Sequence, residues 1–413
     1  MSRWLPIVCL MTRTNLLRDA AFRNVYLSSS VSAFGSQVGY VALPLVAVLA
    51  LHAGPGEVGL LSGLGTLAVL VAGLPAGAWV DRVRRLPVMI AADLARAALF
   101  ASVPVLWWVG ELTMGQLYAV AITAGICTLF FDVASQSLVP QLVGRERLTA
   151  ANSLLVGTNA AMDISGRSFA GVLVGVVGAP SAIALDALSY LWSAAFLARL
   201  RSPGPPPAAP GERVARRIGD GLLFVFGHPI LRAALLQGTM VNLGFPLYAV
   251  LLPVLLVSQL GHPEWVLGAY LSIGGLGTLA GSATAHLVGR RLGRGRAAWI
   301  VSLITTPAAL VVPFVGDGAW TWIAAAGWFV LTYRTGLNNV LLVSFRQEVT
   351  PDAMLGRMTA TTRLLLMGAV GAGGLLAGLI GEVWDVRTAM WAGAACMSLS
   401  WLPIFLSPLR QHH

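Results

Sequence analysis

The sequence predicts an all-α membrane protein whose chain crosses a bilayer many times. Three observations lead to this: 57% of the 413 residues are hydrophobic, only 11% are charged, and the mean hydropathy is +0.77. A soluble domain carries about 25% charged and about 45–50% apolar residues. So little charge cannot cover a water-facing surface, and lipid must therefore solvate part of the molecule.

Twelve apolar stretches are long enough to cross the hydrocarbon core as helices, which takes about 20 residues each. The first six cover 26–50, 57–80, 87–110, 114–138, 150–178 and 181–199. The other six cover 230–258, 265–288, 297–315, 319–343, 355–381 and 387–408. Between the two sets lies a Pro-, Gly- and Arg-rich segment at 201–219, which neither continues a helix nor enters lipid cheaply.

The segments expected in chain order follow from these spans. They are an N-terminal segment at 1–25, a six-helix half at 26–200, a linker with an amphipathic piece at 201–229, a second six-helix half at 230–408 and a tail at 409–413.

Arginines and carboxylates occupy alternate loops. One set of loops holds Arg82, Arg84, Arg85, Arg145, Arg147, Arg213, Arg216, Arg217, Arg290, Arg291, Arg294, Arg296, Arg346 and Arg357. The other set holds Glu57, Glu111, Glu264, Asp317 and Glu382, with Arg387 as the basic exception. Because basic loops stay in the cytoplasm, both termini are predicted to be cytoplasmic.

Several other classes of protein are disfavoured. The net charge of +10 is spread over many short loops as a topology signal, so no nucleic-acid partner is expected. Cys9, Cys127 and Cys396 are scattered, without metal-ligand or disulfide spacing. The histidines have no catalytic motif around them and the chain has no lysine for an ATP-binding loop. We therefore expect no enzyme, no metal and no cofactor.

The two halves repeat two features. Gly73-x-x-x-Gly77 ends the second span and Gly277-x-x-x-Gly281 lies in the eighth, each before a basic loop. The loops 140–150 and 351–360 both end in Thr-Ala before a long span. Glycines at this spacing let helix backbones approach closely. Two repeated six-helix halves are a known transporter plan, with the substrate site between them.

The loop after the second span carries a family motif. It reads Gly77-Ala-Trp-Val-Asp81-Arg82-Val-Arg84-Arg85 and resembles the G-x-x-x-D-R-x-G-R-R signature of the major facilitator superfamily. The stretches 131–140, 148–152 and 346–357 resemble the drug and siderophore exporter branch, which includes macrolide-efflux and enterobactin-exporter-like proteins.

The resemblance implies the major facilitator fold and a transporter in the cell membrane, acting as a monomer on a small amphipathic substrate. It implies proton-coupled export of drugs, macrolides or siderophores, with the proton gradient as energy source. Gly77, Asp81, Arg82 and Arg85 would form a conformational latch. Spans one, four, seven and ten line the cavity in this family. Candidate wall residues, unless they serve as interhelical hydrogen bonds, are Gln37, Gln136, Asn242, Tyr248, Arg334 and Asn338.

Charged side chains within the spans indicate a structural or functional role, because inserting each one into the membrane costs about 2.5–3.5 kcal/mol. Asp163 and Arg167 share a helix face. They form either a cavity pair whose carboxylate carries a proton or a structural pair. Asp132 is a candidate proton or cation site, part of a cytoplasmic gate, or a carboxylate exposed to loop water, with Arg96 among its candidate partners. Asp93, three residues before Arg96, favours a structural pair with it.

One position departs from the exporter pattern. Where proton-coupled exporters carry Gly-Pro-x-x-x-Gly, this chain reads Gly166-Arg167-Ser-Phe-Ala-Gly171. Arg167 in place of proline supports an alternative, a facilitative importer or a lipid or lysophospholipid flippase on the same fold.

Overall fold

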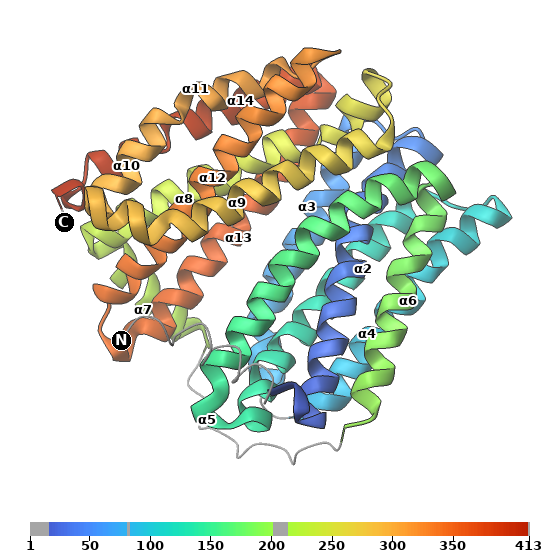
Figure 1. The fold of residues 1–413 in the computed structure, drawn as a ribbon, viewed down its shortest axis with the longest axis horizontal. Helices are drawn as coiled ribbons and strands as arrows, with labels where there is room; N and C mark the ends of the chain where they lie inside the picture. The colour runs from blue at the N-terminus through green and yellow to red at the C-terminus, as the bar shows by residue number, and fades with distance from the viewer. Residues whose placement is uncertain (1–15, 81–82, 201–213, 412–413) are drawn as a thin grey trace. The chain divides into compact units, whose positions relative to one another are not determined.

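The computed structural model describes residues 16–80, 83–200 and 214–411, and these residues form helices without a strand (Figure 1). Within these ranges, eleven helical segments are long and apolar enough to cross a membrane. The all-α polytopic fold class predicted from composition is confirmed.

The helices follow the predicted order. The first group is α2 (Ala20–Ala50), α3 (Pro55–Val80), α4 (Arg85–Val109), α5 (Met114–Val177) and α6 (Ala179–Ala198). Then come α7 (Val214–Gly227), α8 (Pro229–Ala249), η1 (Val254–Gln259), α9 (Glu264–Leu292), α10 (Arg294–Ile304), α11 (Thr306–Val311) and η2 (Val312–Phe314). The last group is α12 (Ala319–Glu348), α13 (Asp352–Val383), α14 (Val386–Leu399), α15 (Leu402–Phe405) and η3 (Pro408–Gln411).

The first span begins earlier than hydropathy predicts. Asp19 Oδ1 accepts hydrogen bonds from the backbone N–H of Ala21, at 2.9 Å, and of Phe22, at 3.4 Å. This side chain satisfies donors that the first helical turn leaves open. Helix α2 therefore starts at Ala20, inside the segment expected as the N-terminal tail.

The fourth and fifth predicted spans are both present, as Met114–Gly144 and Ala150–Val177, but the connection between them is tighter than the predicted loop. Helix α5 continues from Met114 to Val177, and its backbone departs from helical geometry only at Gly144, with φ 71° and ψ 163°. A positive φ is readily adopted by glycine alone. The kink at Gly144 therefore separates the fourth span from the fifth.

Two spans of the second half, 230–258 and 297–315, are interrupted, and a third, 319–343, is less apolar than expected. Helix α8 ends at Ala249, and a π-helical turn, η1, follows after Pro253. The span 297–315 consists of α10, α11 and η2 in succession. Helix α12 spans 30 residues but is not among the eleven apolar segments found in the described chain.

The chain divides into two compact units. The first unit is Met1–Val46 with Val71–Ala209, and the second is Ala47–Leu70 with Pro210–His413. The start of α3 therefore belongs to the second unit. There, Gly59 lies backbone to backbone against Gly378 of α13.

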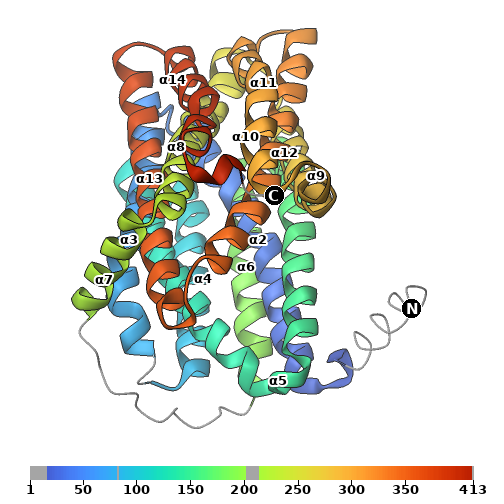
Figure 2. The same cartoon turned by 90° about the vertical axis from the view of Figure 1, so that its left-hand side faces the viewer.

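The amphipathic piece predicted after the linker is α7, while 201–213 lie outside the described residues. Helix α7 packs against α13 (Figure 2). Asp220 Oδ2 of α7 pairs with Arg357 Nη1 of α13 at 2.9 Å. A Cβ at Gly221 would collide with Thr361 and the Arg357 backbone, so these two helices approach closely.

The repeated glycine motifs are not equivalent in packing. Gly277 and Gly281 of α9 lie directly against the backbone of α12, at Phe329 and Tyr333. A Cβ added at Gly73, by contrast, would meet only a methyl group of Leu129, at 4.0 Å. The glycines of the second motif therefore bring two helix backbones into close contact, whereas Gly73 of the first motif does not.

We predict that Gly59→Ala destabilises the protein by about 1–3 kcal/mol, because the added Cβ overlaps with Gly378 and an overpacked contact must shift. Gly157→Ala is the matched control, since nothing lies within 4 Å of its Cβ position. Gly157→Ala should stabilise the protein by up to about 1 kcal/mol, because alanine favours the helix more than glycine does. Thermal unfolding in detergent measures both, and equal midpoints would contradict the close packing of α3 on α13.

Candidate functional site

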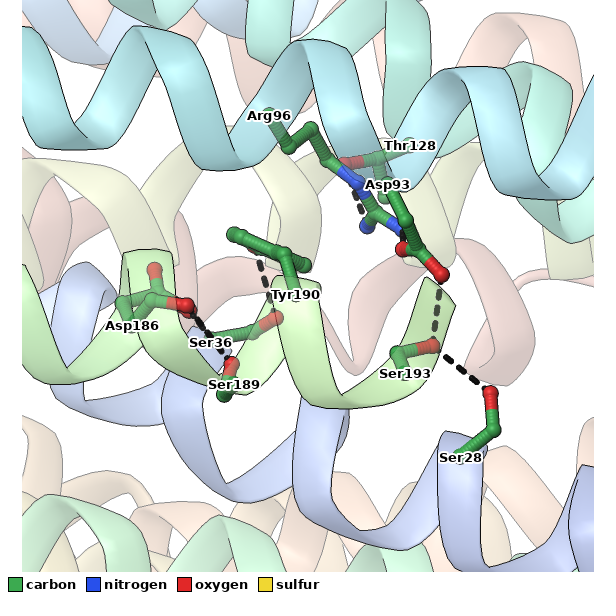
Figure 3. Close-up of polar contacts among 9 residues, drawn as sticks. All are labelled: Ser28, Ser36, Asp93, Arg96, Thr128, Asp186, Ser189, Tyr190 and Ser193. Carbon is green, nitrogen blue, oxygen red and sulfur yellow. Dashed lines mark hydrogen bonds and ion pairs between the residues drawn. The ribbon is translucent and has the colours of Figure 1, made fainter. Parts of the chain in front are cut away.

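The core of the first unit holds two opposite charges on α4. Asp93 and Arg96 are 0% and 2% exposed. Arg96 Nη2 pairs with Asp93 Oδ1 (Figure 3), the structural pair that the three-residue spacing favours. Because both ions have left water, their mutual attraction and their remaining hydrogen bonds must replace hydration.

The Arg96 guanidinium also contacts two other helices. Its carbon Cζ is 4.2 Å from the ring centroid of Tyr190 on α6 and 4.7 Å from that of Phe131 on α5. Its Nη1 donates to Thr128 Oγ1 of α5 over 3.3 Å. A cation over an aromatic face is attracted by the ring quadrupole. One side chain therefore joins α4 to α5 and α6.

The second oxygen of Asp93 links α4 to α6 and α2. Ser193 Oγ of α6 donates to Asp93 Oδ2 over 2.5 Å, and the hydroxyls of Ser193 and Ser28 on α2 share a hydrogen bond of 2.6 Å (Figure 3). Both carboxylate oxygens of Asp93 thus have a donor.

A second carboxyl lies in the same core. Asp186 of α6 is 0% exposed. Its Oδ1 accepts from Ser189 Oγ over 3.3 Å, while no partner of its Oδ2 is found among the described residues. Asp186 is absent from the sites predicted above, although an ionisable residue inside the span 181–199 is the very signal that points to such a site.

Asp163 and Arg167 are joined through a third residue. Gln37 Nε2 of α2 donates to Asp163 Oδ1 over 2.6 Å, and Arg167 Nε donates to Gln37 Oε1 over 2.8 Å. Their shared helix face would allow a direct ion pair, but the described residues show none between Asp163 and Arg167. Gly166 permits the bridge, because a Cβ there would meet Gln37 Cβ at 2.7 Å.

The expected latch is only partly visible. Gly77 lies near the end of α3, and Asp81 and Arg82 lie outside the described residues. Arg85 begins α4, and its Nη1 donates to the main-chain oxygen of Ser137 on α5 over 3.1 Å.

The remaining candidates of the first unit lie on one side of α5. Asp132 and Gln136 are one helical turn apart, and both side chains are exposed. Arg96, named above among the candidate partners of Asp132, is directed into the core at Asp93 instead.

The second unit contains a cavity of about 270 Å³ between α8, α12 and α13. Its lining mixes basic, amide, hydroxyl and apolar side chains: Asn242, Val343, Arg346, Gln347, Met358, Thr359, Thr362, Arg363, Leu366 and Met367. A smaller recess shares Asn242 and Arg346 with it and reaches Arg334 and Asn338. Three of the predicted wall residues therefore line adjoining hollows.

Two predicted wall residues also support the packing around them. Arg334 is 0% exposed and donates to the Met397 main-chain oxygen over 3.0 Å and to its Sδ over 3.3 Å. Asn338 Nδ2 donates to Ser302 Oγ over 2.9 Å. Tyr248 lines neither hollow, because it is buried and donates to the Ala309 main-chain oxygen over 2.8 Å.

Among the described residues, no three His, Cys, Asp or Glu side chains lie together. Apolar helices that hold ionisable groups and enclose a cavity of mixed lining define the class: a polytopic membrane transporter. The chain belongs to the Major Facilitator Superfamily, whose sequence model matches residues 25–373.

Known relatives extend over almost the whole chain. The multidrug efflux pump Tap of Mycolicibacterium fortuitum is 27% identical, covering 91% of this chain and 93% of Tap. The enterobactin exporter EntS of Escherichia coli O1:K1 / APEC is 25% identical, covering 93% and 91%. An inward-facing bacterial homologue of the iron transporter ferroportin shares the fold, with a TM-score of 0.75, 16% identity and coverage of 94% and 98%.

We predict that Arg96→Met lowers stability by about 3–5 kcal/mol, because removing one partner leaves a buried carboxylate without its cation. The double variant Asp93→Asn with Arg96→Met should recover part of that loss, since neither charge remains. Thermal unfolding of the detergent-solubilised protein compares them. A double variant less stable than Arg96→Met would show that the pair is not the source of the effect.

Proposed function

We propose that the protein is a proton-coupled exporter of amphipathic small molecules that works by alternating access. The observation that carries this proposal is the hydrogen bond from Gln37 of α2 to the half-buried carboxyl of Asp163 on α5. A titratable group between two helices makes the contact between them depend on its proton.

The bridge suggests how a proton biases the conformation. The ionised Asp163 is balanced by Arg167 through the Gln37 amide, which donates to one charge and accepts from the other. Protonation removes the negative charge, so the hydrogen bond loses its ionic character and Arg167 loses its counter-charge. A state in which α2 and α5 separate is then favoured, and the proton shifts the population toward it.

Export and substrate class are supported by the relatives and by the cavity. Tap is a multidrug efflux pump and EntS is an enterobactin exporter by name. In the second unit, apolar Val343 and Leu366 line the same cavity as the basic Arg346. Such a mixed lining suits amphipathic molecules, since apolar walls hold their bodies and few polar groups orient them.

The remaining features of the proposal concern place and gating. Both termini lie in the cytoplasm and the protein acts as a monomer in the cell membrane, with the proton gradient as its energy source. Gly77, Asp81, Arg82 and Arg85 act as a latch, which the contact of Arg85 with α5 supports.

A specific observation favours a second candidate, a facilitative importer or lipid flippase. Arg167 reaches the Asp163 bridge from the position where proton-coupled exporters carry proline. If this cation keeps Asp163 ionised throughout the cycle, the carboxylate carries no proton, and transport proceeds without coupling.

Reconstituted liposomes with an internal pH dye test the proposal, with lipophilic cations, macrolides and siderophores offered in turn. We expect substrate-dependent proton movement that Asp163→Asn or Asp132→Asn lowers by about tenfold or more, equal to ~1.4 kcal/mol. The exposed Glu57→Gln should behave as wild type.

The opposite result selects the alternative. Substrate movement without a proton signal, unchanged in both aspartate variants, would rule out antiport and favour a facilitator or flippase. Counterflow in vesicles of known orientation then separates export from import.

The cavity has its own test. We predict that Thr359→Trp weakens substrate binding about tenfold, or ~1.4 kcal/mol, because the indole fills a space that Thr359 now lines. Val340→Trp is the control, since Val340 is exposed on α12 and lines neither hollow. Equilibrium binding of a radiolabelled substrate from the transport screen measures both variants, and equal affinities would place the substrate elsewhere.

A further inference from the structure

We propose that Asp186 is a proton-binding site, which holds its proton while α2 is packed on α6 and releases it when that packing opens. Proton binding at Asp186 is a property of the first unit by itself. Its use in transport rests on the proposed proton coupling.

The charges in this core do not balance. Two carboxyls, Asp93 and Asp186, share it with one guanidinium, Arg96. Asp93 takes the ion pair with Arg96 and a hydrogen bond from Ser193. Asp186 Oδ1 receives the hydroxyl of Ser189, and its Oδ2 has no hydrogen-bond partner among the described residues.

The other polar groups around Asp186 are neutral. Helix α6 contributes the Tyr190 hydroxyl, which shares a hydrogen bond of 3.0 Å with Ser36 of α2 (Figure 3). Among the described residues, the other charged groups buried in this core are Asp93 and Arg96 of α4. An ionised Asp186 would therefore leave one negative charge unbalanced.

Full burial makes that charge unfavourable. A carboxylate removed from water is far more costly than the neutral acid unless a cation balances it, so the group takes a proton instead. In the packed state, Asp186 is therefore the neutral acid, and Asp93 is the ionised partner of Arg96.

Glycines of α2 close the site. A Cβ at Gly39 would overlap with Asp186 Oδ2, and one at Gly35 would overlap with the Ser189 hydroxyl. The α2 backbone itself thus covers the carboxyl, and no side chain separates them. Water reaches Asp186 only when α2 moves away from α6, and hydration then stabilises the carboxylate and frees the proton.

Infrared spectroscopy of the full chain in lipid tests proton binding directly, since a protonated carboxyl has its own C=O stretch. Wild type at neutral pH should show the band of a buried neutral acid, and Asp186→Asn should lose it. Glu57→Gln, an exposed carboxyl, should leave it unchanged.

A second variant tests the charge count and does not alter Asp186. In Asp93→Asn, the single guanidinium faces a single carboxyl. Asp186 should then ionise to balance Arg96, and the band should disappear at the same pH. An unchanged band in Asp93→Asn, or no loss of the band in Asp186→Asn, would overturn the proposal.

Release is tested by alkaline pH and by added substrate, either of which should diminish the wild-type band. If neither alkaline pH nor substrate changes the band, Asp186 is a fixed structural acid, and this result also overturns the proposal. If the band responds but liposomes show no proton-coupled transport, the site stands and the proposed function fails. If coupling holds, Asp186→Asn should retain counterflow but lose accumulation driven by a pH gradient.

Discussion

The first unit depends on the satisfaction of Arg96, a guanidinium held 2% exposed within apolar helices. A buried cation must find its partners in the protein, or the unit does not form. Its own helix supplies the carboxylate of Asp93, α5 supplies a hydroxyl and a ring, and α6 supplies the ring of Tyr190. Asp93 then reaches α2 through Ser193. Each partner fixes the register of another helix, so one charge specifies how four helices meet.

The second unit satisfies a buried guanidinium in another way. Arg334 donates to the backbone oxygen and the sulfur of Met397, and no carboxylate joins it among the described residues. Its positive charge therefore remains unbalanced beside a hollow that Arg346 also lines. The two units share loop motifs in sequence, yet one buries an excess of carboxyl groups and the other an excess of guanidinium. The repeat conserves a scaffold for spanning helices, and the electrostatics of each unit arise from residues outside the repeated motifs.

Sequence predicts well what depends on local composition. The spans and the family follow from hydropathy and from the loop around Gly77, because lipid contact and loop charge act on short stretches of chain. The boundary between the fourth and fifth spans was predicted a few residues too early, because the helix continues to Gly144, where a kink separates Met114–Gly144 from Ala150–Val177. The bridge of Gln37 between Asp163 and Arg167 could not be predicted, since it depends on the register of α2 against α5. Asp186 could have been predicted as a candidate site, because a single carboxyl within a span is visible in the local sequence.

Helix α2 takes part in both carboxyl sites, and glycine sets its distance at each. Gly166 of α5 lets Gln37 approach Asp163, while Gly35 and Gly39 of α2 lie against α6 at Asp186. Such contacts consist of backbone and short polar groups, so they lack the interlocking side chains that hold a packed helix in one place. A displacement of α2 would thus change the surroundings of both carboxyls at once, one through its amide partner and the other through its access to water. The protonation of Asp163 and that of Asp186 would then both depend on the position of α2. The unit could thus couple proton binding to helix movement without a carboxyl that contacts the substrate.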